Sequence, residues 1–317
     1  MESGSAQIGP RSGGKILDLG FNIYFGNLVK LLLASAVIAI PLGIVLIGLN
    51  VAAFAEPGPS DELGLVEIGS TIKRVDYDYF NLMQFIGIGV TAIAYLLIIG
   101  ASYTAANDAY FSRPVSVGGS VGVAMRRFHS LLWVSLLTGI AVILGLLALI
   151  VGAIVVWVLL SVAIPALLDE DLRGTKALRR SWNLVRNNGW RTFLVLFVAG
   201  IFTGLVQFLA ELAASAANGL AEDQIELWVV VVESLSALGF AFSASFTAVV
   251  VTVIYYDLRI RKEGFDIELM TSRLEGGEGS GGQAAGRAWG EATAPSEPPA
   301  SPPPSSPPPP PPGPAPG

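Results

Sequence analysis

The chain has no cysteine and only one histidine, and both absences limit its chemistry. Without cysteine there are no disulfides, no thiolate metal sites and no cysteine nucleophile. HExxH does not occur, which argues against metalloproteases. Residues 9–15 fit GxxxxGK, but Ile16 follows where a phosphate-binding loop has Ser or Thr. Residues 118–122 fit Gly-x-Ser-x-Gly, but they lie in a predicted amphipathic helix and not in a strand-to-helix turn, so we expect neither a nucleotide hydrolase nor a serine hydrolase. The single histidine, His129, follows Arg126 and Arg127 at the start of an apolar run, where a residue of the membrane boundary is the simplest interpretation. We therefore expect no enzymatic activity and no cofactor.

Charged residues are also scarce: they make up 14% of the chain, against 52% hydrophobic residues. Soluble domains carry about 25% charged residues. The apolar residues are gathered in long runs, and runs of about 20 residues or more are typical of membrane-spanning helices. The composition therefore predicts an all-α membrane protein and gives no indication of a nucleic-acid partner.

Six membrane spans are expected. A 38-residue stretch, 131–168, contains no charge. As one helix it would be about 57 Å long, almost twice the hydrocarbon thickness of a bilayer. It should therefore fold back near residues 147–152 as a hairpin. The six predicted spans are 28–54, 80–106, 131–148, 151–168, 192–217 and 228–256.

The basic residues indicate an orientation. The loop at 55–79 has six acidic residues and only two of the 19 Lys and Arg residues, Lys73 and Arg74. The other 17 lie at the opposite ends of the predicted spans or in the segments beyond them. Because Lys and Arg are enriched in cytoplasmic segments, we expect a multi-pass protein of the cell membrane with both termini in the cytoplasm.

Three short amphipathic helices are predicted, at 15–27, 117–129 and 175–189, each leading into an odd-numbered span. Apolar and basic residues fall on opposite sides of each, as in helices that lie in the headgroup plane of a membrane. In the third helix the apolar stripe is Leu178, Trp182 and Val185. The fold class is therefore a six-transmembrane helical bundle with three cytoplasmic interfacial helices. The residues predicted to contact anionic headgroups are Arg126, Arg127, Lys176, Arg179, Arg180 and Arg186.

Two carboxylates, Glu211 and Glu233, lie inside predicted spans. Charged residues at such positions are costly and often functional. Both lie near the outer ends of neighbouring spans, so they either form an intramembrane pair or reach the outer headgroup region with Glu222, Asp223 and Glu226. We favour the second interpretation.

The two termini are expected to be disordered. Residues 1–14 are polar and rich in Gly and Ser, and residues 270–317 form a tail rich in Gly and Pro. The proline run at 307–312 favours polyproline II, which suits an aromatic groove in a protein partner, although a solvated tail is the simpler interpretation. The membrane domain is thus residues 15–269.

Two stretches resemble a known family. They are Pro165–Gly174, continuing through Ala177–Trp182 and Trp190–Arg191, and Tyr255–Asp266. Both are similar to the membrane domain attached to some bacterial glycerophosphoryl diester phosphodiesterases, and to related stand-alone actinobacterial proteins. The resemblance implies that phosphodiesterase chemistry would belong to a separate soluble barrel with histidines and metal-binding carboxylates. With one histidine, this chain is not expected to have that activity.

Two functions follow from these observations. The first is a non-catalytic membrane module that organises anionic lipid, or a protein partner, through its basic helices and its tail. The alternative is a carrier or channel for a small solute or lipid, in which Glu211 and Glu233 would face each other in a cavity.

Overall fold

The structure is a computed structural model that describes residues 11–53, 63–68, 71–147, 149–216 and 224–265. The described residues belong to one unit, Met1–Asp266; the predicted tail and residues 1–10 lie outside them. Six helical stretches of this unit are long and apolar enough to cross a membrane, which confirms a helical membrane protein. These are α2 (Leu28–Ala53), α3 (Tyr77–Tyr110), α5 (Phe128–Leu147), α6 with α7 (Leu149–Leu160 and Ala163–Asp169), α9 (Gly189–Ser215) and α10 (Ile225–Glu263).

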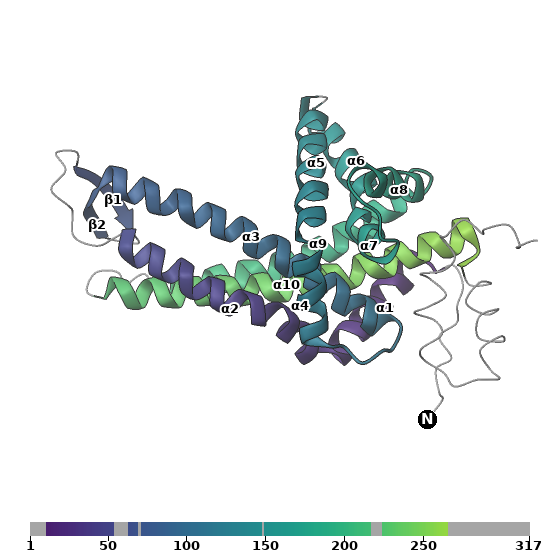
Figure 1. The fold of residues 1–317 in the computed structure, drawn as a ribbon, viewed down its shortest axis with the longest axis horizontal. Helices are drawn as coiled ribbons and strands as arrows, with labels where there is room; N and C mark the ends of the chain where they lie inside the picture. The colour runs from purple at the N-terminus through teal and green to yellow at the C-terminus, as the bar shows by residue number, and fades with distance from the viewer. Residues whose placement is uncertain (1–10, 54–62, 69–70, 148, 217–223, 266–317) are drawn as a thin grey trace, which may run out of the picture. The chain divides into compact units, whose positions relative to one another are not determined.

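Helices α2, α3, α9 and α10 run along one another, with α10 in contact with the other three (Figure 1). Small and aliphatic side chains allow this close packing, among them Ile38 of α2 and Ala94, Ile98 and Ala101 of α3. A buried hydrogen bond of 3.0 Å joins the hydroxyl groups of Ser35 and Ser102 across α2 and α3. Helix α10 has 39 residues and is about 58 Å long, so it extends well beyond a hydrocarbon layer of about 30 Å.

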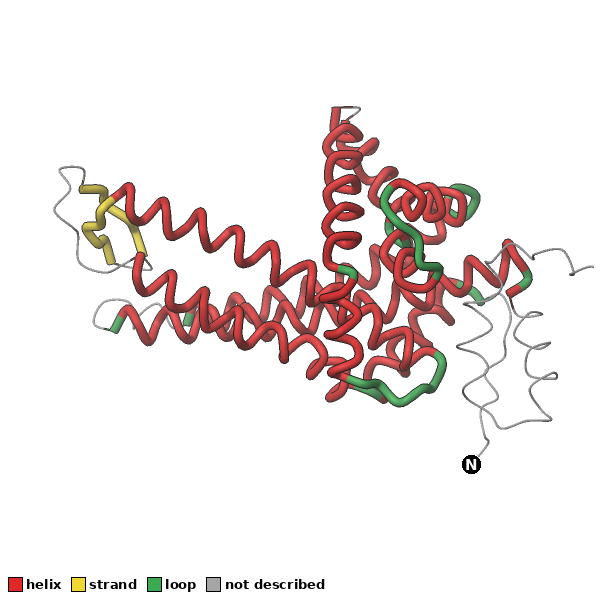
Figure 2. The backbone as a smooth tube through the Cα atoms, in the orientation of Figure 1, coloured by secondary structure: helices red, strands yellow, loops and turns green. Residues whose placement is uncertain are grey.

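Helices α5 and α6 form the predicted hairpin. Their connection falls at residue 148, inside the expected turn, and Leu149 has a positive φ of 73°. A Cβ on Gly145 would lie 3.0 Å from the carbonyl oxygen of Gly152, so a larger residue here would push the two helices apart by a few tenths of an ångström. Most large side chains of the hairpin are exposed, and α5 runs across the direction of α2, α3 and α10 (Figures 1 and 2). An apolar surface of this kind requires lipid around it.

The predicted span 151–168 is interrupted. Helix α6 ends at Leu160, and α7 begins at Ala163. Pro165 explains the break, because it has no N–H for the carbonyl of Ser161 and its ring clashes with that carbonyl in a continuous helix.

The three short helices are present as α1 (Gly13–Gly26), α4 (Val117–Arg126) and α8 (Thr175–Val185). Ser12 caps α1, so residues 11–14, which we predicted to be disordered, are ordered. Each helix buries its apolar face against other helices of the protein. In α1, for example, Tyr24 is fully buried and its hydroxyl donates to the carbonyl of Phe242 at 3.1 Å.

The predicted apolar stripe of α8 is wrong in one respect. Trp182 is 44% exposed, whereas Ala177, Leu184 and Val185 form the buried face together with the small polar Ser181. We had placed Trp182 on the apolar stripe because it is the largest apolar side chain of the helix. The hydroxyl of Ser181 nevertheless fits the interior, because it donates to the carbonyl of Leu159 at 2.8 Å.

A β-hairpin connects α2 and α3 in the region predicted only as a loop. Strand β1 (Leu63–Ile68) pairs antiparallel with β2 (Thr71–Asp76), with Ile68 opposite Thr71. The all-α prediction did not include it. The signal was available, since two runs rich in apolar and β-branched residues flank the dipeptide Gly69-Ser70.

Candidate functional site

The two stretches that carry the family resemblance meet at one end of the helices. The hydroxyl of Tyr255 donates to Glu170 Oε1 at 2.7 Å, and that of Tyr256 lies 2.7 Å from Asp169 Oδ1. The Tyr256 hydroxyl also lies 2.6 Å from the side-chain oxygen of Asn107. A phenol has one proton, so an Asn107 amide turned to donate to Tyr256 satisfies both contacts. Helix α10 is thus fixed to α3 and α7.

Arg259 lies at the centre of this cluster, and its side chain is only 7% exposed. Its Nη1 donates to Asp169 Oδ2 at 2.8 Å, and its Nε lies 3.4 Å from Glu263 Oε2. The guanidinium carbon lies 4.2 Å from the ring centre of Phe265. A buried charge is tolerated when it is paired in this way.

Arg180 connects three helices. Its Nε donates to both carboxylate oxygens of Glu170 at 2.8 Å, and its Nη2 donates to Glu263 Oε2 at 2.8 Å. Burial alone would lower the pKa of this guanidinium, but the hydrogen bonds that it donates to Glu263 and Glu170 outweigh burial and raise the pKa. Arg180 therefore holds α8 against α7 and α10 as a structural residue.

Asp257 joins the two ends of the described chain. Its side chain is 1% exposed and accepts from Arg191 Nη1 at 2.7 Å and from Arg261 Nε at 2.9 Å. The backbone N–H of Arg11 donates to its other oxygen at 2.8 Å. The start of α1 is thereby attached to the end of α10 and the start of α9.

Arg127 pairs with Asp171, in the segment between α7 and α8. The hydrogen bond from Arg127 lowers the pKa of the Asp171 carboxyl below its ordinary value. Arg127 and Arg180, two of the six predicted headgroup contacts, are therefore engaged in ion pairs within the protein. The prediction took both as lipid contacts because they have partners distant in sequence: Asp171 is 44 residues from Arg127, and Glu263 is 83 residues from Arg180.

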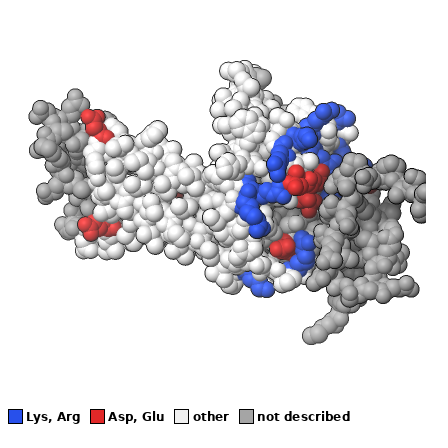
Figure 3. Space-filling model, viewed as in Figure 1, with Lys and Arg blue, Asp and Glu red and all other residues white. Residues whose placement is uncertain are grey.

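The other four predicted headgroup contacts are exposed. These are Arg126, Lys176, Arg179 and Arg186. None of them forms an ion pair with a residue in the described part of the chain. Figure 3 shows Lys and Arg gathered at the end of the molecule that carries α4 and α8, with an uncharged stretch between this end and the β-hairpin. We call these four residues the exposed basic patch.

Two exposed tryptophans lie close in sequence to Arg179 and Arg186 of this patch. Trp182 of α8 is 44% exposed, and Trp190, in the first turn of α9, is 73% exposed. Trp190 stacks on Phe193, with 5.4 Å between the ring centres. Tryptophan is enriched where the hydrocarbon layer meets the headgroups, so these rings suit that depth.

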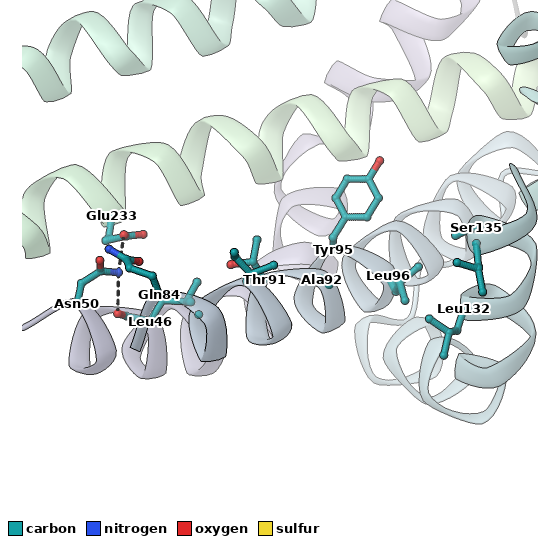
Figure 4. A pocket seen from close by; sticks show the side chains of 13 residues that line it. Leu46, Asn50, Gln84, Thr91, Ala92, Tyr95, Leu96, Leu132, Ser135 and Glu233 are labelled. Atoms are coloured by element: carbon teal, nitrogen blue, oxygen red, sulfur yellow. Dashed lines mark hydrogen bonds between the residues drawn. The ribbon is translucent and has the colours of Figure 1, made fainter. Parts of the chain in front are cut away.

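Glu211 and Glu233 have different surroundings. Glu233 lines a cavity of about 640 Å³ and accepts from Asn50 Nδ2 at 3.1 Å (Figure 4). Glu211 does not line this cavity; it accepts from Gln207 at 3.2 Å and from Ser236 at 3.4 Å. The structure therefore does not bring the two carboxylates together in this cavity.

We did not predict that the carboxylates Asp169, Glu170 and Asp257 are partners of the arginines. They were visible inside the two distinctive stretches, each within a few residues of an arginine. In the described part of the chain, no group of three His, Cys, Asp or Glu residues is placed to hold a metal ion.

No family model, curated protein or solved structure matches this chain. The resemblance to the phosphodiesterase-associated membrane domain therefore stays a prediction.

Proposed function

We propose that the protein is a non-catalytic membrane module that holds anionic phospholipid at its basic end. The observation that carries the proposal is the exposed basic patch beside Trp182 and Trp190. Tryptophan favours the depth of the headgroups, and each cation close to an anionic surface contributes about 1 kcal/mol of attraction. The ion pairs of Arg180 and Arg259 fix α8 against α7 and α10, so the three cations of α8 and its C-cap, Lys176, Arg179 and Arg186, are presented from a rigid support.

We further propose that this end lies on the cytoplasmic side of the cell membrane, as the distribution of Lys and Arg indicates. Because the chain has no cysteine, single cysteines can report its orientation. In intact cells, Lys176→Cys should resist a membrane-impermeant maleimide, and Gln224→Cys, at the start of α10, should react. The reverse pattern would refute the orientation.

Lipid retention tests the proposed function directly. The protein is reconstituted with equal amounts of phosphatidylglycerol and phosphatidylcholine and re-extracted, and the retained lipids are quantified. Changing all four residues of the exposed basic patch to Gln should lower the retention of phosphatidylglycerol relative to phosphatidylcholine about tenfold or more. The control changes Lys73 and Arg74 to Gln and should retain phosphatidylglycerol as the wild type does. Equal retention by the patch variant would refute the proposal.

A carrier or channel is the weaker of the two functions. That alternative required Glu211 and Glu233 to face each other, and the two have separate partners, Ser236 and Asn50. The cavity beside Glu233 is lined by one carboxylate and mostly apolar side chains.

A further inference from the structure

The cavity beside Glu233 is a groove with one polar end and an apolar body. Figure 4 shows Glu233, Asn50 and Gln84 close together at one end and Leu96 with Leu132 at the other. Gln84 and Leu96 are 12 residues apart in α3, which is about 18 Å along the helix. Side chains of α5 line the far end of the groove.

The groove is open toward the hydrocarbon layer. Ile88 and Thr91, which line it from α3, are exposed, and so are Leu132 and Leu136 of α5. In a bilayer such surfaces contact acyl chains. A groove that is open at the side, apolar and about 18 Å long is suited to one acyl chain of a phospholipid.

The polar end lies at the depth of the headgroups. Tyr255 begins the ion-pair cluster at the basic end, and Glu233 precedes it by 22 residues in α10. This separation is about 33 Å, close to the hydrocarbon thickness of a bilayer. A phospholipid whose chain lies in the groove would therefore place its headgroup beside Glu233.

The charge of the groove selects the headgroup. Glu233 is the one charged residue among those that line it, and none of them is Lys or Arg. Asn50 directs its side-chain amide to Glu233 Oε1 at 3.1 Å, which holds the carboxylate in place. A lipid with net negative charge is repelled here, whereas an ammonium group that donates hydrogen bonds is attracted. We propose that this groove binds a phospholipid with a primary ammonium headgroup, with the ammonium at Glu233 and one acyl chain along α3.

This proposal does not depend on the exposed basic patch, because it concerns another lipid at the opposite end of α10. The test reconstitutes the whole protein with equal amounts of phosphatidylethanolamine, phosphatidylcholine and phosphatidylglycerol. The lipids that remain bound after mild extraction are identified by native mass spectrometry. The wild type should retain phosphatidylethanolamine over phosphatidylcholine by roughly fivefold, as one partly exposed ion pair provides.

Two variants with matched controls locate the site. Glu233→Gln should abolish the preference for phosphatidylethanolamine, and Glu211→Gln should keep it. Ala92→Trp should block the groove and lower the retention of phosphatidylethanolamine, whereas Ile93→Trp, an exposed neighbour that does not line the groove, should have no effect.

Three results would overturn the proposal: no preference in the wild type, an unchanged preference in Glu233→Gln, or equal retention by the two tryptophan variants. Failure of this proposal is distinguishable from failure of the anionic-lipid proposal. Phosphatidylglycerol retention should respond to changes in the exposed basic patch and not to Glu233→Gln.

Discussion

The two ends of α10 use their charged residues in different ways. At the basic end, Arg259, Asp257 and Glu263 are each engaged by ionic partners from other helices or from the same helix. Near the other end, Glu233 has a neutral partner, Asn50, and lines a groove. Charges that have partners within the protein stabilise it, and charges directed toward open space are available to a ligand. The partners of a charged residue therefore indicate its role better than its position in a span.

The largest expected effect is the loss of Arg259. Arg259→Met keeps most of the side-chain volume but leaves Asp169 without its buried cation, which should cost about 3–5 kcal/mol. Thermal unfolding of the detergent-solubilised protein measures this change. Arg179→Met, in the exposed basic patch, is the control and should change stability by about 0.5 kcal/mol or less. Similar losses in both variants would contradict the distinction between paired and exposed arginines.

An intermediate effect is expected at Tyr256. Tyr256→Phe removes the hydroxyl that contacts Asp169 and Asn107, and a hydrogen bond to a charged group contributes about 1.5–3 kcal/mol. The same unfolding experiment measures it. Tyr103→Phe is the matched control, because the Tyr103 hydroxyl forms no hydrogen bond with the described residues and its ring is buried as well. The prediction fails when the control loses as much stability as Tyr256→Phe.

The smallest effect is expected at the exposed pair of Arg127 and Asp171. The pKa of Asp171 is lowered by its hydrogen bond with Arg127, so the stabilisation is fully present above the ordinary value of 3.8. It is lost as the pH falls through the lowered pKa. Because the carboxylate is mostly exposed, the contribution should be at most about 0.5 kcal/mol. Wild type and Asp171→Asn should differ in stability at pH 7, and the difference should shrink progressively as the pH falls below 3.8; a difference that did not change with pH would rule out this pair as its source.

Local signals in the sequence predicted most of the helices but not their partners. The hairpin of α5 and α6 followed from the length of an uncharged run, and the short helices from their periodicity. The interruption at Ser161 was also accessible, since Pro165 lies four residues later. The pairing of Arg180 with Glu263 was not, because the two residues are 83 positions apart and meet only through the packing of α9 and α10, which no local pattern defines.

The same reasoning explains what was missed at the candidate sites. Glu211 and Glu233 were expected to be close because they lie in neighbouring helices of a hairpin. Whether two residues of such helices face each other depends on how each helix is rotated about its axis. In the structure Glu233 is directed toward Asn50 of α2, whereas Glu211 contacts Ser236, three residues further along α10.

The attachment of Arg11 to Asp257 has a consequence for synthesis of the protein. The two residues are 246 positions apart, so at 5–20 residues per second the ribosome adds Asp257 roughly 12–50 s after Arg11. During that interval the amphipathic helix α1 lacks the α10 surface that later buries Tyr24. A nascent chain must therefore keep this helix at the membrane or on an insertion factor until its last helix has been inserted.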